Sequence, residues 1–137
     1  MNKRLLLVIL MIFLVTIFFC GCQEQEAITS HNSFEGITFE SSVAELVDAS
    51  LDVHEENNIL TRVDVKYLFR NIAGKDLELY VTVEYYDKGN NLLATGGPKI
   101  IILPEGYTEQ VILPANIISY SGEKVSEVEY VKIIAKD

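Results

Sequence analysis

Apolar and polar residues alternate along two stretches in the middle of the chain, "ILTRVDVKYLFRN" (59–71) and "LELYVTVEYY" (77–86). A repeat of two residues is typical of a β-strand with one buried face. The residues expected to point inward are Val63, Val65, Tyr67, Phe69, Leu77, Leu79, Val81, Val83 and Tyr85. The intervening "NIAGKD" has turn composition, which predicts that the two strands pair as a hairpin.

The stretch before them, "VAELVDASLDVHEE", allows two interpretations. Ser42 and Glu45 have the spacing of a capping box, which would suit a helix over Ser42–Leu51. The alternation of Leu51 with Val53, and the short distance to a turn at "ENN", favours a strand. We therefore expect a strand here and a turn into the strand that begins at Ile59.

Turn residues also separate short apolar segments after residue 86. These segments are "LLATG", "KIIIL", "YTEQVIL" and "VSEVEYVKIIAK", and the turn formers "DKGNN" precede the first. Pro98, Pro104 and Pro114 lie at segment edges, where strands tolerate proline. Pro104 and Gly106 suit the second and fourth positions of a type I turn. The last segment changes phase near Tyr130, which predicts a β-bulge.

About seven short strands, with turns between them and no convincing helix, determine the expected fold class. We expect an all-β, immunoglobulin-like antiparallel β-sandwich over residues 36–137. A chain of 137 residues accommodates one such domain, and its 49% hydrophobic residues can supply a core.

The first 21 residues have the composition of a secretory signal peptide. Lys3 and Arg4 precede an uncharged apolar run, Leu5–Phe19, and the small Gly21 follows it. As a helix this run would span roughly 22 Å, short of the ~30 Å hydrocarbon core of a bilayer. We expect residues 1–21 to be removed, and an uncleaved membrane anchor stays open as the alternative.

Cys20 and Cys22 end the apolar run, one residue apart. A disulfide between them would close a strained loop, and a zinc site would need the distant His31 and His54. The stretch "FCGC" instead resembles the lipobox of bacterial and archaeal lipoproteins. That resemblance implies that Cys22 carries a lipid, becomes the first mature residue and anchors the protein on the outer side of the cytoplasmic membrane.

Residues 22–35 are polar and lack periodicity, which predicts a flexible tether of on the order of 20 Å between anchor and domain. Removal of residues 1–21 takes away Lys3 and Arg4 and changes the formal net charge from −9 to −11. This acidity argues against a nucleic-acid partner, because nothing here could neutralise a phosphate backbone. It also repels an anionic membrane surface, so the lipid would hold the domain there.

The segment Val83–Asp87, "VEYYD", is similar to the signature of the FxLYD domain family, with Val in place of Phe and Tyr in place of Leu. The later "KGNNLLATG", "LPEGYTEQVIL" and "VEYVKI" also resemble that family, so the likeness covers roughly residues 46–136. It implies an immunoglobulin-like sandwich, common in prokaryotic lipoproteins, without known catalytic residues.

The sequence lacks the usual motifs of catalysis and cofactor binding. It has two histidines, His31 and His54, no Gly-x-Ser-x-Gly stretch, and a "TGGP" that leads into a strand instead of a helix. We therefore expect no enzyme activity, no cofactor and no dedicated metal site. Oxygen ligands gather at 52–58 and 87–91, where ordinary turns are favoured and a weak calcium site stays open.

Outward residues of the expected hairpin form a candidate partner-binding face. The two tyrosines lie on one strand and the three basic residues on the strand expected beside it. These residues are Tyr80, Tyr86, Arg62, Lys66 and Arg70. The alternative is that they only pair across strands with Glu78 and Glu84.

Two functions follow as hypotheses. The favoured one is a lipid-anchored, surface-exposed, non-catalytic module that binds or scaffolds another cell-envelope component, either a protein or a glycan. The alternative is a receptor or sensory lipoprotein domain that binds a small ligand or calcium.

Overall fold

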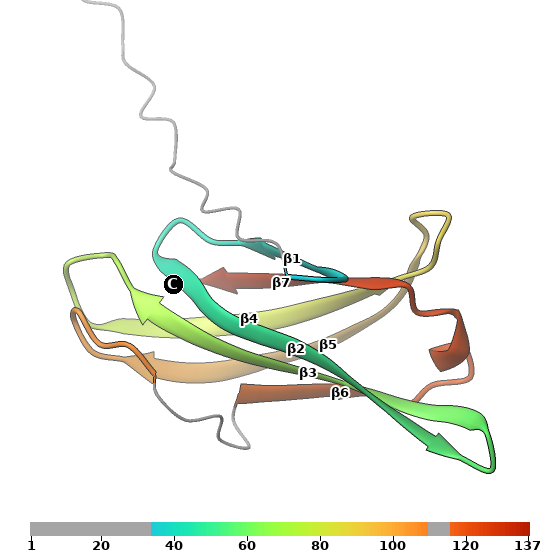
Figure 1. Cartoon of the computed structure of the whole chain (residues 1–137). Coiled ribbons are helices and arrows are strands. Elements are labelled where there is room, and N and C mark those ends of the chain that lie inside the picture. Colours follow the sequence, from blue (N-terminus) through green and yellow to red (C-terminus); the bar gives the residue numbers. More distant parts are fainter. Residues whose placement is uncertain (1–33, 110–115) are drawn as a thin grey trace, which may run out of the picture.

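Two layers of β-strands form the domain (Figure 1). The computed structural model describes residues 34–109 and 116–137. The strands in these ranges are β1 (Ile37–Glu40), β2 (Ala44–Glu56), β3 (Ile59–Asn71), β4 (Leu77–Tyr86), β5 (Leu92–Leu103), β6 (Ile117–Tyr120) and β7 (Tyr130–Lys136). A short 3-10 helix, η2 (Val125–Glu127), precedes β7.

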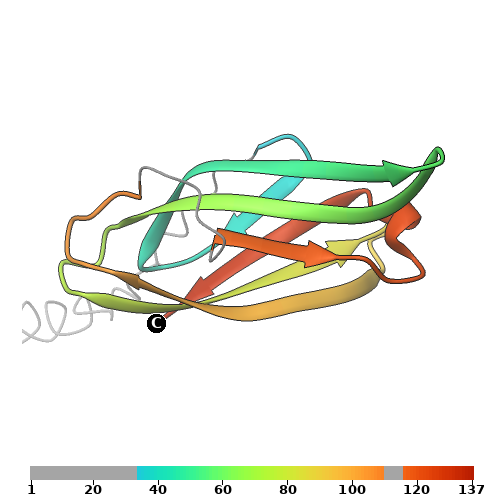
Figure 2. The same ribbon diagram turned by 90° about the horizontal axis from the view of Figure 1, so that it is seen from below.

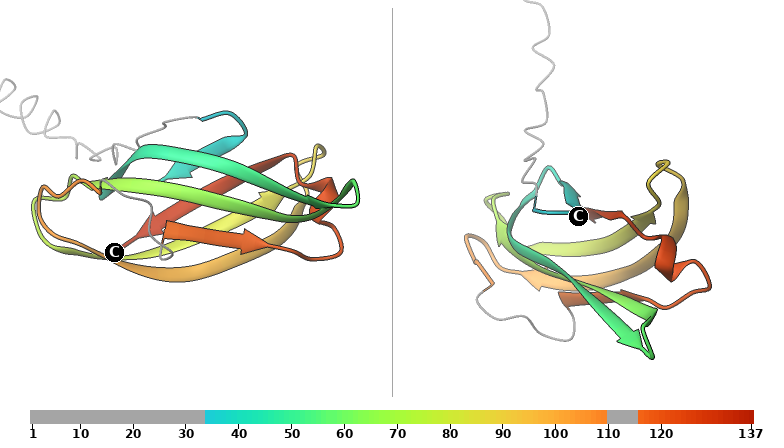
Figure 3. Two further views of the ribbon diagram at one scale, coloured as in Figure 1. Left: turned by 60° about the horizontal axis from the view of Figure 1, so that its bottom comes forward. Right: turned by 45° about the vertical axis from the view of Figure 1, so that its right-hand side comes forward.

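The strands form a four-stranded sheet in the order β1-β7-β4-β5 and a three-stranded sheet in the order β2-β3-β6. Figures 2 and 3 show the two sheets as separate layers from other sides. Within the described ranges the strand pairings are antiparallel, except that β1 runs parallel to β7. The expected all-β sandwich is therefore confirmed.

Large side chains from both sheets fill the space between the layers. All nine residues predicted to point inward from β3 and β4 are at most 4% exposed. Aromatic rings join the sheets: the ring centroids of Phe39 and Phe69 lie 5.5 Å apart, and those of Tyr85 and Tyr120 lie 5.2 Å apart. The Tyr85 hydroxyl donates to the Ile118 carbonyl at 3.0 Å, which satisfies the polar end of a buried ring.

β3 and β4 do not form the hairpin predicted from the sequence. β3 lies between β2 and β6 in one sheet, and β4 lies between β7 and β5 in the other. The backbone at the end of β3 is already paired, because the Asn71 N–H donates to the Tyr107 carbonyl at 2.9 Å and the Phe69 carbonyl accepts from the Glu109 N–H at 3.0 Å. The chain therefore crosses from one sheet to the other over residues 72–76.

The predicted strand before β3 is confirmed as β2, and the helix alternative is wrong. The Ser41 hydroxyl accepts the Ala44 N–H at 3.1 Å and so organises the turn that leads into β2. At the other end, Asn57 and Asn58 have φ of 53° and 61°. Positive φ at both positions is what a two-residue type I′ turn requires, so β2 and β3 form the hairpin of this sheet.

Residues 34–109 and 116–137 contain seven strands, as many as predicted, but the set of strands differs. "LLATG" and "KIIIL" form a single strand, β5, and Pro98 lies inside it beside a β-bulge opposite Val81–Val83. Pro98 is therefore not at a segment edge, and β5 tolerates it because β5 is last in its sheet and bulges there. β1 and β6 were not among the predicted strands.

The turn after β5 is shifted by one residue from the predicted type I turn. The Tyr107 N–H donates to the Pro104 carbonyl at 3.0 Å, and Gly106 has φ of 67°. Pro104 is thus the first residue of the turn and Gly106 the third, where positive φ favours glycine. Thr108 then forms an isolated bridge with Arg70. The rest of the predicted strand "YTEQVIL" beyond residue 109, and Pro114, lie outside the described residues.

η2 replaces the first part of the strand predicted over "VSEVEYVKIIAK". β7 begins at Tyr130 and pairs with β4 without a register shift, so the bulge predicted near Tyr130 is not present. The inward residues of β7 are Val131, Ile133 and Ala135. The two residues out of phase with β7 have different roles: Val128 follows η2 and packs against the core before β7 begins, and Tyr130 stacks on Tyr86 on the outer face.

The predicted signal peptide (1–21), Cys22 and most of the tether predicted over 22–35 lie outside the described residues. Phe34 already belongs to the domain, because it forms a bridge with Ile37 and packs against the core. Within the residues that the structure describes, no helix is long and apolar enough to cross a membrane.

Asn71 holds together the end of the sandwich where the chain changes sheets, and its replacement tests this fold. Its Nδ2 lies 2.7–3.0 Å from the carbonyl oxygens of Lys75, Leu103 and Pro104. Asn71→Ala leaves buried carbonyls without a donor, and we expect it to lower the free energy of unfolding by about 2–3 kcal/mol. Urea denaturation measures the change, with the exposed Ser126→Ala as control. Equal midpoints for the two variants would contradict the role of Asn71.

Candidate functional surfaces

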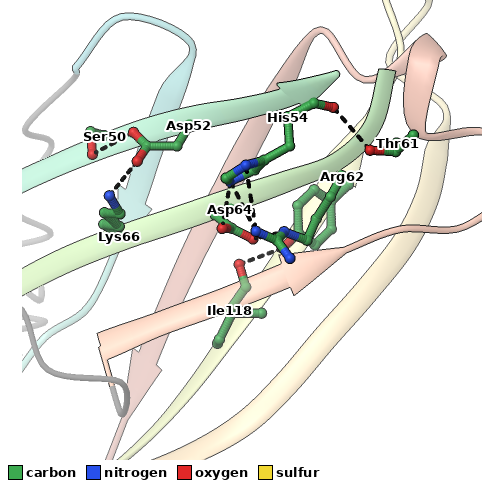
Figure 4. A network of polar contacts seen from close by, with 9 residues as sticks. Ser50, Asp52, His54, Thr61, Arg62, Asp64, Lys66 and Ile118 are labelled. Carbon is green, nitrogen blue, oxygen red and sulfur yellow. Dashed lines mark hydrogen bonds and ion pairs between the residues drawn. The ribbon is translucent and has the colours of Figure 1, made fainter. Parts of the chain in front are cut away.

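The outer face of the three-stranded sheet carries a network of charged residues (Figure 4). Arg62, Lys66 and Arg70 lie along β3 and point away from the core. Lys66 forms an ion pair with Asp52, and Nη1 of Arg70 lies 3.0 Å from Oε2 of Glu45. Both carboxylates come from β2, so charges on neighbouring strands compensate each other.

Asp64 is the centre of this network. It is 8% exposed, and its Oδ2 lies 2.8 Å from Nε2 of His54. Its Oδ1 has no aligned hydrogen-bond donor among the described residues and lies 3.0 Å from Nε of Arg62, which acts on it through charge. Burial alone would raise the pKa of Asp64, but hydrogen bonds to Ser119 and His54 and the charge of Arg62 outweigh it and lower that pKa.

His54 is the only histidine among the described residues, and both of its ring nitrogens contact members of this network. Besides the contact with Asp64, Nη2 of Arg62 lies 3.2 Å and 3.4 Å from the two ring nitrogens. A histidine base needs a nucleophile within hydrogen-bond reach. No hydroxyl or thiol bonds to this ring in residues 34–109 and 116–137. The arrangement therefore satisfies charges on the sheet, and it does not assemble a nucleophile–base pair.

The outer face of the four-stranded sheet carries the two predicted tyrosines, and Tyr86 is the more enclosed of them. Its ring stacks on Tyr130 of β7 with centroids 5.0 Å apart and planes inclined by 4°. Its hydroxyl donates to Glu84 at 2.7 Å, and this bond is the main cause that raises the pKa of Tyr86 to about 12. Tyr86 is thus covered and satisfied by its own sheet.

Tyr80 is the exposed tyrosine, and two isoleucines of β5 lie beside it. Its hydroxyl donates to Glu78 at 2.7 Å, which raises the pKa of Tyr80. Ile100 lies directly opposite Tyr80, and Ile102 lies opposite Glu78. Tyr80, Ile100 and Ile102 are 44%, 55% and 65% exposed. We refer to these three residues as the apolar strip.

The five residues predicted to form one face are divided between two faces. Because β3 and β4 belong to different sheets, the three basic residues lie on the outer side of one layer and the two tyrosines on the outer side of the other. The basic residues also pair with carboxylates of β2 and β3, and the predicted alternative of pairing with Glu78 and Glu84 is wrong. The combined face does not exist.

In the turn at Asp87–Asn91, the carboxylate oxygens that could bind a cation accept hydrogen bonds from the turn itself. Oδ1 of Asp87 accepts the N–H groups of Gly89 at 2.7 Å and Asn91 at 2.9 Å. The side-chain amide of Asn91 also bonds to Asp87 and is the main cause that lowers the pKa of Asp87. In the described part of the chain, no three His, Cys, Asp or Glu side chains are grouped to hold a metal ion.

An open depression of about 460 Å³ lies between residues 34–36, β2 and Glu129, near the point where the chain enters the domain. Phe34, Ala49 and Leu51 line it together with Glu35 and Glu129. Its lining contains no Lys, Arg or His. The small-ligand alternative would rest on a depression such as this one, which lacks a basic group that would bind an anion.

Sequence reasoning did not single out Ile100 and Ile102. A signal was present, because "KIIIL" is apolar at four successive positions and must place apolar residues on both faces of a strand. Glu109 and Asn116 were also missed. The Glu109 carboxylate accepts hydrogen bonds from the Phe69 N–H at 2.8 Å and from the Asn116 side-chain amide at 2.6 Å, so it links β3 to the residue that precedes β6.

Comparison with protein-family models, with curated proteins and with solved structures finds no match for this chain.

Asp64→Asn tests the polar network through the pH dependence of stability. Because the folded-state pKa of Asp64 is lowered from 3.8, the ionised carboxylate stabilises the fold above that pH, and the contribution is lost as the pH falls through the folded pKa. We expect the variant to be less stable by about 1–3 kcal/mol at pH 7. The difference from the native chain should be constant well above pH 3.8 and should shrink as the pH falls below 3.8. Thermal melts between pH 3 and pH 7 measure it, with the exposed Asp48→Asn as control; a difference independent of pH would contradict this role.

Proposed function

We propose that this chain is a lipid-anchored, extracytoplasmic, immunoglobulin-like module that binds another molecule of the cell envelope and has no catalytic activity of its own. The observation that carries the proposal is the apolar strip. Its three large side chains are exposed side by side on a strongly acidic domain. Exposed apolar groups that form a contiguous patch mark interaction sites, whereas scattered ones need no explanation.

The contrast between the two outer faces supports this choice of surface. The basic residues of β3 are each paired with a carboxylate, so a partner would have to break existing ion pairs to use them. Tyr86 is covered by Tyr130. The strip has no comparable cover among the described residues, and burying it against a partner would remove apolar surface from water.

The proposed anchor rests on the sequence. The apolar leader and the "FCGC" stretch place a lipid on Cys22, and the domain begins at Phe34, only a short polar segment later. Such a segment holds the domain on the order of 20 Å from the membrane surface. After removal of the leader the domain carries a net charge of −11, which an anionic membrane surface repels, so the lipid and not electrostatic attraction would hold the domain there.

The segment that resembles the FxLYD signature agrees with a structural and not a catalytic role. Val83 and Tyr85 are completely buried in the core, and Asp87 organises the following turn. The signature residues therefore specify a strand and its turn. The receptor alternative has weaker support, because the depression beside β2 is open and Asp87 is already bonded within its own turn.

The anchor is tested by comparing the two cysteines. We expect the mature protein to begin at Cys22 and to carry an acyl modification by intact-mass spectrometry. Cys22→Ser should abolish the modification and the partition into detergent, because the serine hydroxyl does not replace the thiol in thioether formation. Cys20→Ser is the matched control and should leave both unchanged. An unmodified chain that starts at Met1 would overturn the proposed anchor.

The binding surface is tested by photo-crosslinking in intact cells. A photoreactive phenylalanine analogue replaces Tyr80 on one outer face or, as the matched control, Arg70 on the opposite face. We expect a crosslinked product from position 80 and none from position 70. A product from position 70 alone would assign binding to the other sheet, and the absence of products from both would contradict binding through either face.

A further inference from the structure

We infer that the partner of the apolar strip is a second copy of this chain, joined by antiparallel pairing of the two β5 strands. The inference rests on the function proposed above and adds the identity of the partner.

β5 is the last strand of the four-stranded sheet, so among the described residues its outer edge has no neighbouring strand. The two halves of this edge differ. The first half is interrupted by the bulge near Pro98, which has no N–H to donate. The second half, residues 99–103, is paired residue by residue with β4 and has no bulge or proline of its own. A regular unprotected edge can accept another strand.

Antiparallel pairing centred on Ile101 matches this half of β5 with itself. Ile100 of each copy then faces Ile102 of the other, while Ile101, 6% exposed, still points into its own core. Ile100 and Ile102 lie on the same outer face as Tyr80. The strips of the two copies therefore join into one apolar surface. A shift by one residue would place outward side chains opposite inward ones, so the core pattern disfavours it.

Antiparallel pairing centred on Ile101 places Lys99 of each strand opposite Leu103 of the other. The directly opposed residues of the segment 99–103 include no pair of like charges. Most other orientations would bring two acidic surfaces together, because the domain carries a large negative net charge.

The contact is short, so its strength depends on the membrane. Five residues of strand edge and the joined strips bury less than the roughly 1,200–2,000 Å² of stable complexes, and association in dilute solution should be weak. Anchoring both copies in one membrane raises their effective concentration without any further contact. We therefore expect the association in the full, membrane-anchored chain.

The identity of the partner is tested with the photoreactive analogue in place of Ile102 in the full chain, in intact cells. We expect a product of twice the chain's mass that yields peptides of this chain alone. A product with a different polypeptide would overturn the inference and leave the proposed function intact. The absence of any product would contradict both.

The register is tested with two differently tagged full chains produced in the same cells. Ile102→Lys paired with itself, and Ile100→Glu paired with itself, should each reduce co-purification about tenfold, because each opposes a charge to an apolar side chain. Mixing the two variants places lysine opposite glutamate and should restore co-purification. Ile59→Lys is the matched control, since Ile59 is 67% exposed at the hairpin end that projects past β6 (Figure 3). Unchanged co-purification of Ile102→Lys with itself, or no restoration in the mixture, would overturn the inference.

Discussion

β3 and β4 bury their inward residues in one core from opposite sheets, and the rest of the structure depends on this arrangement. Tyr67 and Phe69 from one strand, and Val83 and Tyr85 from the other, are completely buried between the layers. Asn71 makes the arrangement possible, because its side-chain amide satisfies carbonyl groups at the end where the chain passes between sheets. Without such a donor those carbonyls would be buried unpaired, which is costly in a protein interior.

Placing β3 and β4 in different sheets also decides what each outer face presents to the surroundings. The outer residues of β3 lie beside β2, where carboxylates are available, and a network around Asp64 compensates the basic side chains. The outer residues of β4 lie beside β5, where Ile100 and Ile102 are exposed. One face is thus electrostatically satisfied, and the other keeps apolar surface in contact with water.

Ile100 and Ile102 of the apolar strip lie on the edge strand β5, so this surface combines backbone groups that can pair with a strand and exposed apolar side chains. Backbone groups along 99–103 can orient a strand, and the isoleucines beside them can fix its register. The bulge near Pro98 limits this edge to its second half. A short edge suits a molecule whose proposed lipid anchor already holds it beside its neighbours, since confinement compensates for a small contact area.

The sequence by itself determined the all-β class, the strands β2, β3 and β4, and which residues of β3 and β4 face the core, because period-two burial is a local property of each strand. It also carried the leader, the cysteine pair and the acidity on which the proposed location rests. Only the tertiary structure decided that β3 and β4 lie in opposite sheets. The alternation of apolar and polar residues in a strand is the same whether the next strand pairs with it in one sheet or lies in the opposite sheet. Contacts between distant segments therefore separate the basic residues Arg62, Lys66 and Arg70 from Tyr80 and Tyr86, and they bring Ile100 and Ile102 beside Tyr80 in the apolar strip. The local pattern does not contain these contacts.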